Sequence, residues 1–301
     1  MSEQKDICYL RSVEEPRGVF LPKEKARISP DDRGFYFADG VYEVIRTYFG
    51  RFFRLQEHLS RFKNSLAAVR IELPDFSRIP EIAWELLKQN KLEKRDAFIY
   101  IQVTRGCWQR NLLFPPKEII PTLYISVTPI IPPEEEQRKG ILAITVPDIR
   151  WQRCDIKSIG LLPSVLARQL AYEQNAQEAI FVRNGFLTEG THTNLFVVKN
   201  GTVFTHPLNN HILPGITRSV VLELCRELNL PVSETAVSES ELSQVEEVFV
   251  TSTTWEIMPV IKINQQTIGL DKPGRITLCL QKEFREYILK FSAPVARSGI
   301  V

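Results

Sequence analysis

One lysine stands directly before an apolar run and could supply an amine for covalent chemistry. Lys157 lies in the segment RWQRCDIKSIGLLP, with Asp155 two residues before it. Most lysines are solvated, so Lys157 could be an ordinary strand-end lysine that pairs with Asp155. A desolvated lysine is instead able to form a Schiff base with a carbonyl compound. Both interpretations are open at this point.

Two short segments have the residue types of a phosphate-binding site. In LPGITRSVV (213–221), Gly215 permits close approach of the backbone, and Thr217 could cap a following helix. The free N–H groups of the first helical turn, together with the helix dipole, suit an anion. In VTSTT (250–254), hydroxyl side chains stand where a strand is expected to end. An ordinary helix cap and a turn rich in threonine and serine would explain the same two patterns.

A carboxylate and a guanidinium complete the set of reactive groups. Glu189, in LTEGTHTN, follows a predicted strand. It is either a turn carboxylate or the partner of a pyridine nitrogen, which must stay protonated if the ring is to act as an electron sink. Arg61 lies at the edge of an apolar helical stripe, and it either extends along the surface or binds a phosphate. Together these groups make the inventory of a pyridoxal-phosphate site.

The elements that must position these groups predict an α+β fold. Hairpins are predicted over 40–53, 178–190 and 194–206, the last two with type I′ turns at Asn184-Gly185 and Asn200-Gly201. Amphipathic or apolar helices are predicted over 56–71, 80–90, 161–176, 215–228 and 275–291. Further strands are predicted over 97–106, 122–130, 141–151 and 246–254. Regular βαβ alternation is not evident, so antiparallel sheets are expected.

The length and one proline-rich segment predict two domains. A chain of 301 residues is long enough for two cores. The segment PIIPPEEEQRKG (129–140) is proline-rich, then acidic, and ends on glycine, which is typical of a linker. We therefore expect a small N-terminal α+β domain over 1–128 and a larger C-terminal α+β domain over 141–301.

Composition argues against several classes of protein. The 38 basic and 36 acidic residues are interspersed and give a net charge of +2, so a nucleic-acid partner is not expected. No apolar run reaches the roughly 18 residues of a membrane span, and the N-terminal segment has no signal-peptide core. The five cysteines form no C-x-x-C motif, which indicates free thiols and a cytoplasmic location. The four histidines lack metal-ligand spacing, so no metal is expected.

The motifs resemble those of fold-type IV pyridoxal-phosphate transaminases, and most closely the D-amino-acid transaminases. The resemblance runs from about Ser29 to the C-terminal helix through DRGFYFADGVYEV, EHLSRF, YIQVTRG, DIRWQRCDIKS, TEGTHTN, HILPGITR and VTSTT. It implies a two-domain fold of antiparallel-rich sheets with flanking helices. It also implies that pyridoxal 5'-phosphate binds at the domain interface.

The resemblance assigns roles to individual residues. It implies that Lys157 bonds covalently to the cofactor and carries the proton, and that Glu189 faces the pyridine nitrogen. The other cofactor-binding residues that it implies are Arg61, Leu213, Ile216, Thr217, Ser252, Thr253 and Arg150. The substrate-binding residues that it implies are Tyr42, Val44, Arg110 and Thr254. Arg110 would reach the substrate carboxylate of a partner subunit, which implies a homodimer.

Two positions depart from the family's pattern. The D-specific enzymes usually have Arg-x-His where this chain has Arg110-Asn111-Leu112, so the carboxylate-binding group is incomplete or differently built. His192 stands in a loop where the family tends to have a small residue. It is either a substitute contact for the substrate or an ordinary loop histidine.

The resemblance implies transfer of the amino group of a D-amino acid, such as D-alanine, to 2-oxoglutarate. The products would be a keto acid and D-glutamate. Tyr42 and Arg110 favour the D-substrate arrangement, whereas Leu112 weakens it. An L-branched-chain transaminase and an aminodeoxychorismate lyase of the same fold are the alternatives, and a binding module without catalysis is the remaining one.

Overall fold

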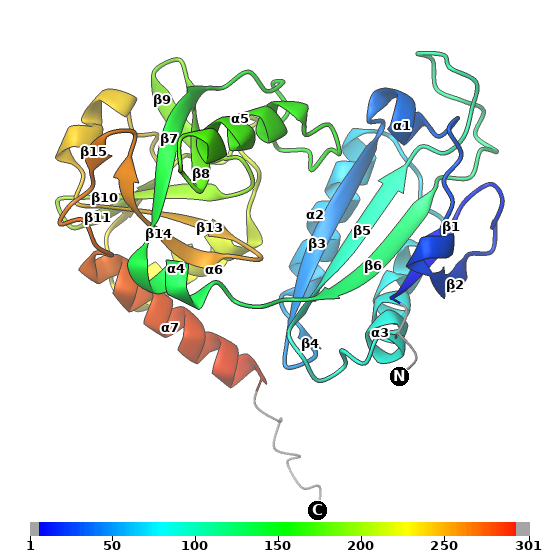
Figure 1. Cartoon of the computed structure of the whole chain (residues 1–301), viewed down its shortest axis with the longest axis horizontal. Coiled ribbons are helices and arrows are strands. Elements are labelled where there is room, and N and C mark those ends of the chain that lie inside the picture. Colours follow the sequence, from blue (N-terminus) through cyan, green and yellow to red (C-terminus); the bar gives the residue numbers. More distant parts are fainter. Residues whose placement is uncertain (1–5, 293–301) are drawn as a thin grey trace, which may run out of the picture.

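The chain builds one β-sheet from each half of its sequence, and helices pack on both sheets (Figure 1). The computed structural model describes residues 6–292. Its strands are β1 (Ile7–Arg11), β2 (Val19–Pro22), β3 (Gly40–Tyr48), β4 (Arg51–Phe52), β5 (Ala97–Thr104), β6 (Leu123–Pro129), β7 (Ile141–Pro147), β8 (Glu178–Arg183), β9 (Phe186–Gly190), β10 (Asn194–Lys199), β11 (Thr202–Thr205), β12 (Val232–Ser233), β13 (Glu247–Ser252), β14 (Glu256–Ile263) and β15 (Gln266–Thr267). Its helices are α1 (Arg33–Phe37), α2 (Leu55–Ala68), α3 (Ile79–Gln89), α4 (Glu134–Lys139), α5 (Leu162–Glu173), α6 (Ile216–Glu227) and α7 (Arg275–Ser292).

The N-terminal sheet has six strands in the order β2-β1-β6-β5-β3-β4, and every pair in it is antiparallel. Helix α2 packs against β3 through the predicted apolar stripe, in which Leu59, Phe62 and Leu66 are buried. Because side chains alternate along a strand, the residues of β3 that face away from the buried core are Tyr42 and Val44, which are half-buried. This face of the sheet is therefore left for the functional site.

The C-terminal sheet has nine strands and closes on itself. Its order is β12-β11-β10-β13-β14-β7-β8-β9, with β15 paired to β14 beside this path. Strand β9 also pairs with β10 at Glu189 and Asn194. Strand β7 runs parallel to both β8 and β14, so β7, α5 and β8 form a βαβ unit within a largely antiparallel sheet. The seam of the closed sheet lies at Glu189, one of the predicted site residues.

The predicted turns and most of the predicted elements are confirmed. Hairpins form at both Asn-Gly pairs, where Asn184 and Asn200 have φ of 53° and 49°. The short elements β1, β2 and α1 and the strand β14 were not predicted. Five residues or fewer give β1, β2 and α1 little periodicity, whereas the eight residues of β14 are nearly all buried and show no alternation.

The connecting segment 129–140 contains a helix that the sequence did not predict. Helix α4 places acidic residues in its first turn and basic residues in its last turn, which suits the helix dipole. Lys139 pairs with Glu135 at 2.5 Å on its outer side. The buried amide of Gln137 donates to the carbonyl of Trp255 at 3.1 Å. The connection is therefore packed against the C-terminal sheet.

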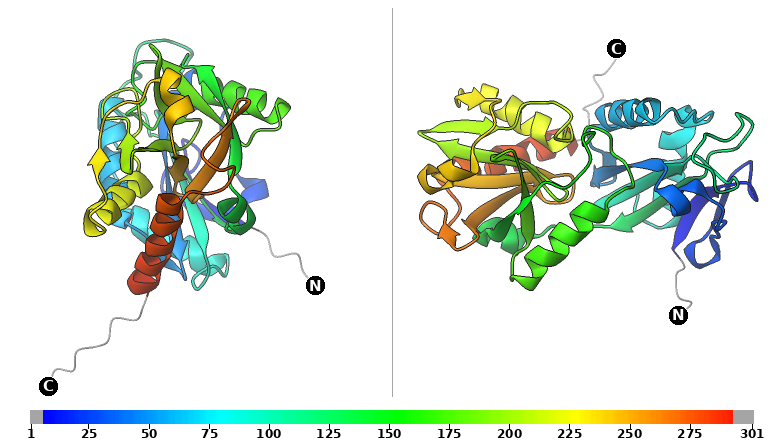
Figure 2. Two further views of the ribbon diagram at one scale, coloured as in Figure 1. Left: turned by 90° about the vertical axis from the view of Figure 1, so that its left-hand side faces the viewer. Right: turned by 90° about the horizontal axis from the view of Figure 1, so that it is seen from above.

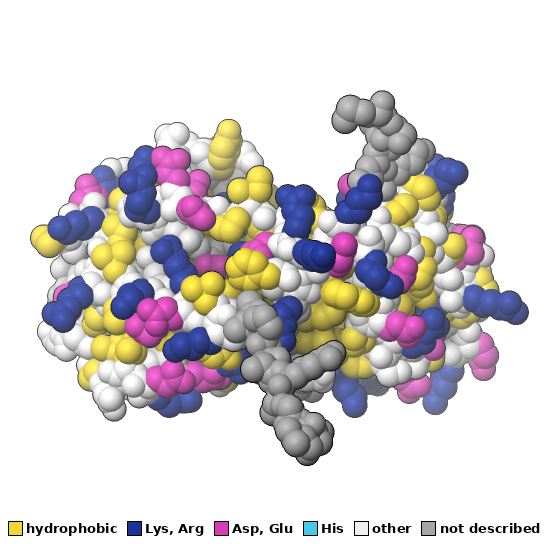
Figure 3. Space-filling view, turned by 90° about the horizontal axis from the view of Figure 1, so that it is seen from below, with side chains coloured by type: hydrophobic (Ala, Val, Ile, Leu, Met, Phe, Trp, Pro, Cys, Tyr) yellow, Lys and Arg dark blue, Asp and Glu magenta, His cyan; other side chains and the backbone are white. Residues whose placement is uncertain are grey.

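The two halves lie side by side, and α5 and the segment before it lie near the junction (Figure 2). On the face seen from below, basic and acidic side chains are intermingled over both halves (Figure 3). Within residues 6–292, no helix is both long enough and apolar enough to cross a bilayer.

Candidate active site

A cavity of about 200 Å³ contains five of the predicted site residues in its wall. They come from β3, from the segment between β7 and α5, from β9, and from the segment before α6: Tyr42, Arg150, Lys157, Glu189 and Leu213. Both halves of the chain thus contribute to one cavity, with an amine, a carboxylate and a phenol in its wall.

Lys157 presents an amine that no carboxylate neutralises. Its Nζ lies 4.4 Å from the centre of the Tyr42 ring and makes no hydrogen bond or ion pair within residues 6–292. Its backbone is fixed by the N-terminal half, because its N–H donates to Ser65 Oγ at 3.2 Å and its carbonyl accepts from the N–H of Tyr42 at 2.9 Å. Asp155 pairs with Arg153 at 2.9 Å, so the alternative of a Lys157–Asp155 pair is wrong. A held backbone and a free amine suit a nucleophile.

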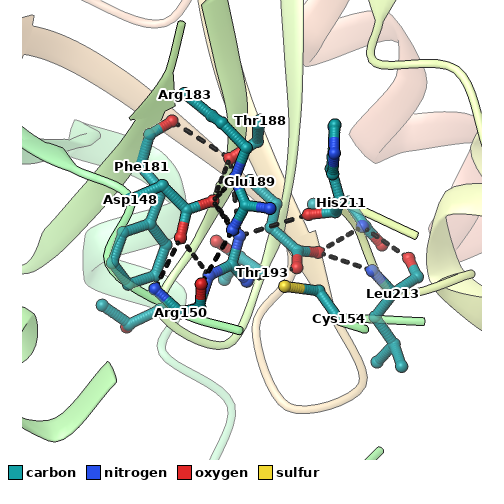
Figure 4. Close-up of polar contacts among 12 residues, drawn as sticks. Asp148, Arg150, Cys154, Phe181, Arg183, Thr188, Glu189, Thr193, His211 and Leu213 are labelled. Carbon is teal, nitrogen blue, oxygen red and sulfur yellow. Dashed lines mark hydrogen bonds and ion pairs between the residues drawn. The ribbon is translucent and has the colours of Figure 1, made fainter. Parts of the chain in front are cut away.

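Glu189 is a buried carboxylate whose two oxygens are both held in place (Figure 4). Its Oε1 accepts from Arg150 at 2.6 Å, and its Oε2 accepts from Asn194 at 3.1 Å and from the N–H of Leu213 at 3.0 Å. Asp148 in turn binds the Arg150 guanidinium at 2.9 Å. Burial raises the pKa of Glu189 to about 7, although Arg150 opposes the shift. A second cation beside this carboxylate would therefore keep it ionised.

The start of α6 offers unused backbone donors. Its N-cap is Gly215, which has no capping side chain, so the expectation that Thr217 caps the helix is wrong. The N–H groups of Ile216 and Thr217 donate to no residue in the described part of the chain. Arg61 lies at the same place, since its Nη1 donates to the carbonyl of Pro214 at 3.0 Å. Two N–H groups, the helix dipole and one guanidinium suit a phosphate.

A buried carboxylate that the sequence analysis missed holds Arg61. Glu43 is completely buried and accepts from Arg61 Nε at 2.9 Å and Nη2 at 2.6 Å, with His58 Nδ1 at 3.0 Å. Burial alone would raise the pKa of Glu43, but Arg61 and His58 lower it well below the ordinary value. Arg61 is 7% exposed, so it does not extend along the surface. Strand alternation is the signal, because Glu43 lies between Tyr42 and Val44 and must point to the opposite face.

The segment VTSTT (250–254), with its hydroxyl side chains, lies beside Glu189. Strand β13 ends at Ser252, and its Thr251 pairs with Asn194, which also binds Glu189. A turn follows in which the N–H of Trp255 donates to Ser252 Oγ at 3.1 Å. Ser252 and Thr253 do not line the cavity, and neither do Arg61, Ile216 and Thr217.

Three predicted substrate residues are also outside the cavity wall. Val44 shares a strand face with Tyr42, and Thr254 lies in the turn after β13. Arg110 is exposed on the loop after β5, where its guanidinium lies 5.4 Å from the centre of the Phe37 ring. The chain does not bring Arg110 to its own cavity.

These groups fit pyridoxal phosphate. Lys157 supplies the amine, the buried Glu189 suits a protonated ring nitrogen, and the start of α6 with Arg61 suits the phosphate. The model of the amino-transferase class IV family matches residues 40–263. The chain belongs to this family. The fold-type IV resemblance is confirmed, and the protein is a pyridoxal-phosphate-dependent aminotransferase.

Relatives and solved structures agree with this class IV assignment. The chain is 43% identical to the D-alanine aminotransferase of Bacillus licheniformis over 278 residues, covering 92% of this chain and 97% of that protein. It is 40% identical to the D-alanine aminotransferase of Staphylococcus haemolyticus, covering 90% and 96%. The branched-chain amino acid aminotransferase of Escherichia coli superposes with a TM-score of 0.83 at 26% identity, covering 94% of each chain. The T.th. branched-chain amino acid aminotransferase complexed with N-(5'-phosphopyridoxyl)-L-glutamate gives 0.84 at 26% identity, covering 95% of each chain.

Sequence reasoning on this class IV aminotransferase missed the residues that hold the site together. Asp148, Asn194 and Glu43 each hold a predicted residue in place. Cys154 also lines the cavity, and burial raises the pKa of its thiol to about 11. The signal for Asn194 is its position at the start of the strand that follows Glu189, within the motif TEGTHTN.

Proposed function

We propose that this enzyme transfers the amino group of a D-amino acid, such as D-alanine, to 2-oxoglutarate, giving a keto acid and D-glutamate. The observation that carries the proposal is one cavity in which the free amine of Lys157 and the buried carboxylate of Glu189 occur together. The substrate class rests on the D-alanine aminotransferases, which are about 40% identical over nine-tenths of the chain.

The residues of the cavity have separate roles in the reaction. When bound, pyridoxal phosphate supplies a ring that withdraws electrons from the substrate Cα. Lys157 Nζ accepts the proton from the substrate Cα and returns it to the carbon that was the aldehyde carbon of the cofactor. Glu189 keeps the proton on the ring nitrogen, and Arg150 and Asn194 hold its carboxylate in place.

The phosphate anchor is built by the N-terminal half and the start of α6. Arg61 and the N–H groups of Ile216 and Thr217 bind the phosphate, with Ser252 and Thr253 beside them. Glu43 keeps the Arg61 guanidinium in position through two hydrogen bonds. Leu213 packs on the ring, and Tyr42, Val44 and Thr254 contact the substrate.

The enantiomer that reacts is the most direct test of this function. We expect D-alanine with 2-oxoglutarate to be turned over at least about 10-fold faster in kcat/KM than L-leucine, because misplacing the carboxylate loses at least one charged hydrogen bond. Chiral analysis of the glutamate product, which forms with either amino donor, would measure both the rate and the enantiomer produced. A preference for L-leucine with formation of L-glutamate would replace the proposal by an L-branched-chain activity. Leu112 and the two branched-chain structures favour that second candidate.

We also propose two domains, 1–128 and 141–301, joined by 129–140, and a cytoplasmic location. Separate sheets on the two sides of α4 support the division, and between them Tyr48 and Phe53 of the N-terminal half pack into a core of the C-terminal half. The ends of both ranges, 1–5 and 293–301, lie outside the described residues. The location is supported by the five cysteines, all of which are free thiols.

We further propose that the enzyme is a homodimer with α5 in its interface. The outer face of α5 carries apolar side chains at helical spacing. Their exposed fractions are 67% for Leu162, 58% for Val165, 55% for Leu166 and 42% for Leu170. Contiguous exposed apolar surface of this kind marks an interface between proteins. A dimer would also explain why Arg110 is absent from its own cavity, since the residue could then reach the substrate of the other subunit.

Leu166→Glu is expected to convert dimers to monomers, because a carboxylate buried in an apolar interface loses its hydration. Sedimentation velocity of the holoenzyme would measure the change. Leu270→Glu is the matched control, since Leu270 is 79% exposed in the turn after β15 and should leave the dimer intact. A variant that sediments as the unmodified enzyme does would place the interface elsewhere.

A further inference from the structure

A second buried carboxylate fixes the turn between β9 and β10, which lines the cavity. Glu178 is 0% exposed at the start of β8. Its Oε1 accepts from Thr191 Oγ1 at 2.5 Å and from the N–H of Thr191 at 3.1 Å, and its Oε2 accepts from Thr193 Oγ1 at 2.9 Å. Arg168 of α5 lies 3.6 Å from the same carboxylate. Residues 191–193 are thus held in one position beside Glu189.

His192 stands on this turn and its ring lines the cavity. Its ring centre lies 4.6 Å from that of Trp255 in an edge-to-face arrangement. Its Nδ1 lies 3.2 Å from Thr191 Oγ1 and 3.4 Å from Glu178 Oε2. The imidazole is therefore held between a carboxylate and an indole at the edge of the site.

The hydrogen bonds determine which nitrogen carries the proton. Thr191 has one hydroxyl hydrogen, and its 2.5 Å bond to Glu178 uses it. At the longer contact Thr191 Oγ1 must therefore accept, so Nδ1 of His192 carries the hydrogen. In the neutral ring Nε2 then has only a lone pair, and it makes no hydrogen bond within residues 6–292.

The His192 side chain is 39% exposed, and its surroundings lower the pKa of the ring in the free enzyme. Three charged groups face it from different elements: Glu178 of β8, Arg168 of α5, and Lys157 of the segment before α5. Burial lowers the pKa of His192, and Arg168 and Lys157 lower it further, against the opposing effect of Glu178. An anion in the cavity beside Nε2 would raise the pKa of His192, because a nearby negative charge favours the protonated ring.

We propose that His192 binds a carboxylate of the substrate as an imidazolium, with Glu178 as its counter-ion, and that one proton is taken up from solvent as the substrate binds. The proton goes to Nε2, which then donates a hydrogen bond to the carboxylate. This inference rests on the proposed function, whose substrates carry one or two carboxylates. It gives the cavity a carboxylate-binding cation where the loop residue Leu112 supplies none.

Proton uptake on binding of unreactive carboxylates tests the inference without turnover. Calorimetric titration of the holoenzyme with glutarate and with butyrate, in two buffers of different ionisation enthalpy, counts the protons bound. We expect up to one proton per site near pH 7.5 in the unmodified enzyme and none in His192→Gln. Uptake with both ligands assigns His192 to the carboxylate that they share, and uptake with glutarate alone assigns it to the second carboxylate. Equal uptake by the enzyme and the variant, or none by either, overturns the inference.

Two substitutions at one position provide a matched kinetic test. His192→Gln places an amide near the position of Nε2, whereas His192→Asn places it near Nδ1. Loss of a hydrogen bond to a charged group should raise the KM for 2-oxoglutarate roughly 10- to 100-fold in His192→Asn and less in His192→Gln, with kcat little changed. The unmodified enzyme should lose affinity as the pH rises from 6 to 8, and both variants should lose this dependence.

The kinetic outcomes separate this inference from the proposed function. An unmodified enzyme that turns over neither D-alanine nor L-leucine would contradict the function alone. An active enzyme whose KM and pH profile are unchanged in both variants would contradict the role of His192 alone.

Discussion

Lys157→Ala is expected to lower the rate of transamination by at least about 10⁴-fold, because the variant lacks both the covalent attachment and the proton carrier. Lys157 Nζ lines the cavity beside Tyr42 and has no carboxylate partner among residues 6–292. In the same described part of the chain, no second lysine lines this cavity. The rate should be measured both in steady state and in a single half-reaction with D-alanine.

The matched control is Lys63→Ala, since Lys63 is exposed on α2 and does not line the cavity. Its rate should equal that of the unmodified enzyme. If Lys157→Ala were to retain even a tenth of the activity with bound cofactor, another group would have to carry the proton, and the assignment would be wrong.

Glu189→Gln is expected to lower kcat by about 100-fold or more, which is the usual range for loss of an acid–base partner. The amide keeps an oxygen for Asn194 and Leu213 but cannot hold a proton on the ring nitrogen as a carboxylate does. It also leaves the buried Arg150 with one fewer anion, since Oε1 accepts from it at 2.6 Å. The effect should therefore fall on the step that removes the Cα proton, seen as a larger isotope effect with α-deuterated D-alanine.

Glu57→Gln is the control for the loss of a carboxylate, because Glu57 pairs with Arg54 at the surface of α2. A surface ion pair of this kind contributes little to stability. Neither of its residues lines the cavity. If Glu189→Gln showed an unchanged isotope effect and kcat, the carboxylate would serve only to hold Arg150.

The sequence alone predicts those helices, turns and site residues that depend on a pattern of neighbouring residues. The stripe of α2 buries Leu59, Phe62 and Leu66 as its period requires, and the Asn-Gly pairs form their turns. What it misses depends on pairing between distant segments. Glu43 meets Arg61 only because β3 packs on α2, and Glu178 meets the loop of His192 only because β8 and β9 form a hairpin.

Errors at single residues have equally local causes. Thr217 has the side chain of an N-cap, but Gly215 has the extended backbone that the position requires, so the helix begins at Ile216 and already includes Thr217. The segment with Glu134 and Lys139 has the composition of a linker, yet its charges are ordered as a helix prefers. Arg110 is a different case. It is expected to act in the cavity of another subunit, so it lies away from the cavity of its own chain.

Covalent trapping of the cofactor on Lys157 tests the central claim most directly. Borohydride reduction of the holoenzyme makes the bond between Nζ and the aldehyde carbon of the cofactor permanent, and peptide mass mapping then locates it. We predict a single pyridoxyl-phosphate adduct in the peptide that contains Lys157, and none in Lys157→Ala. Absence of an adduct, or its location on a different side chain, would contradict the site described above.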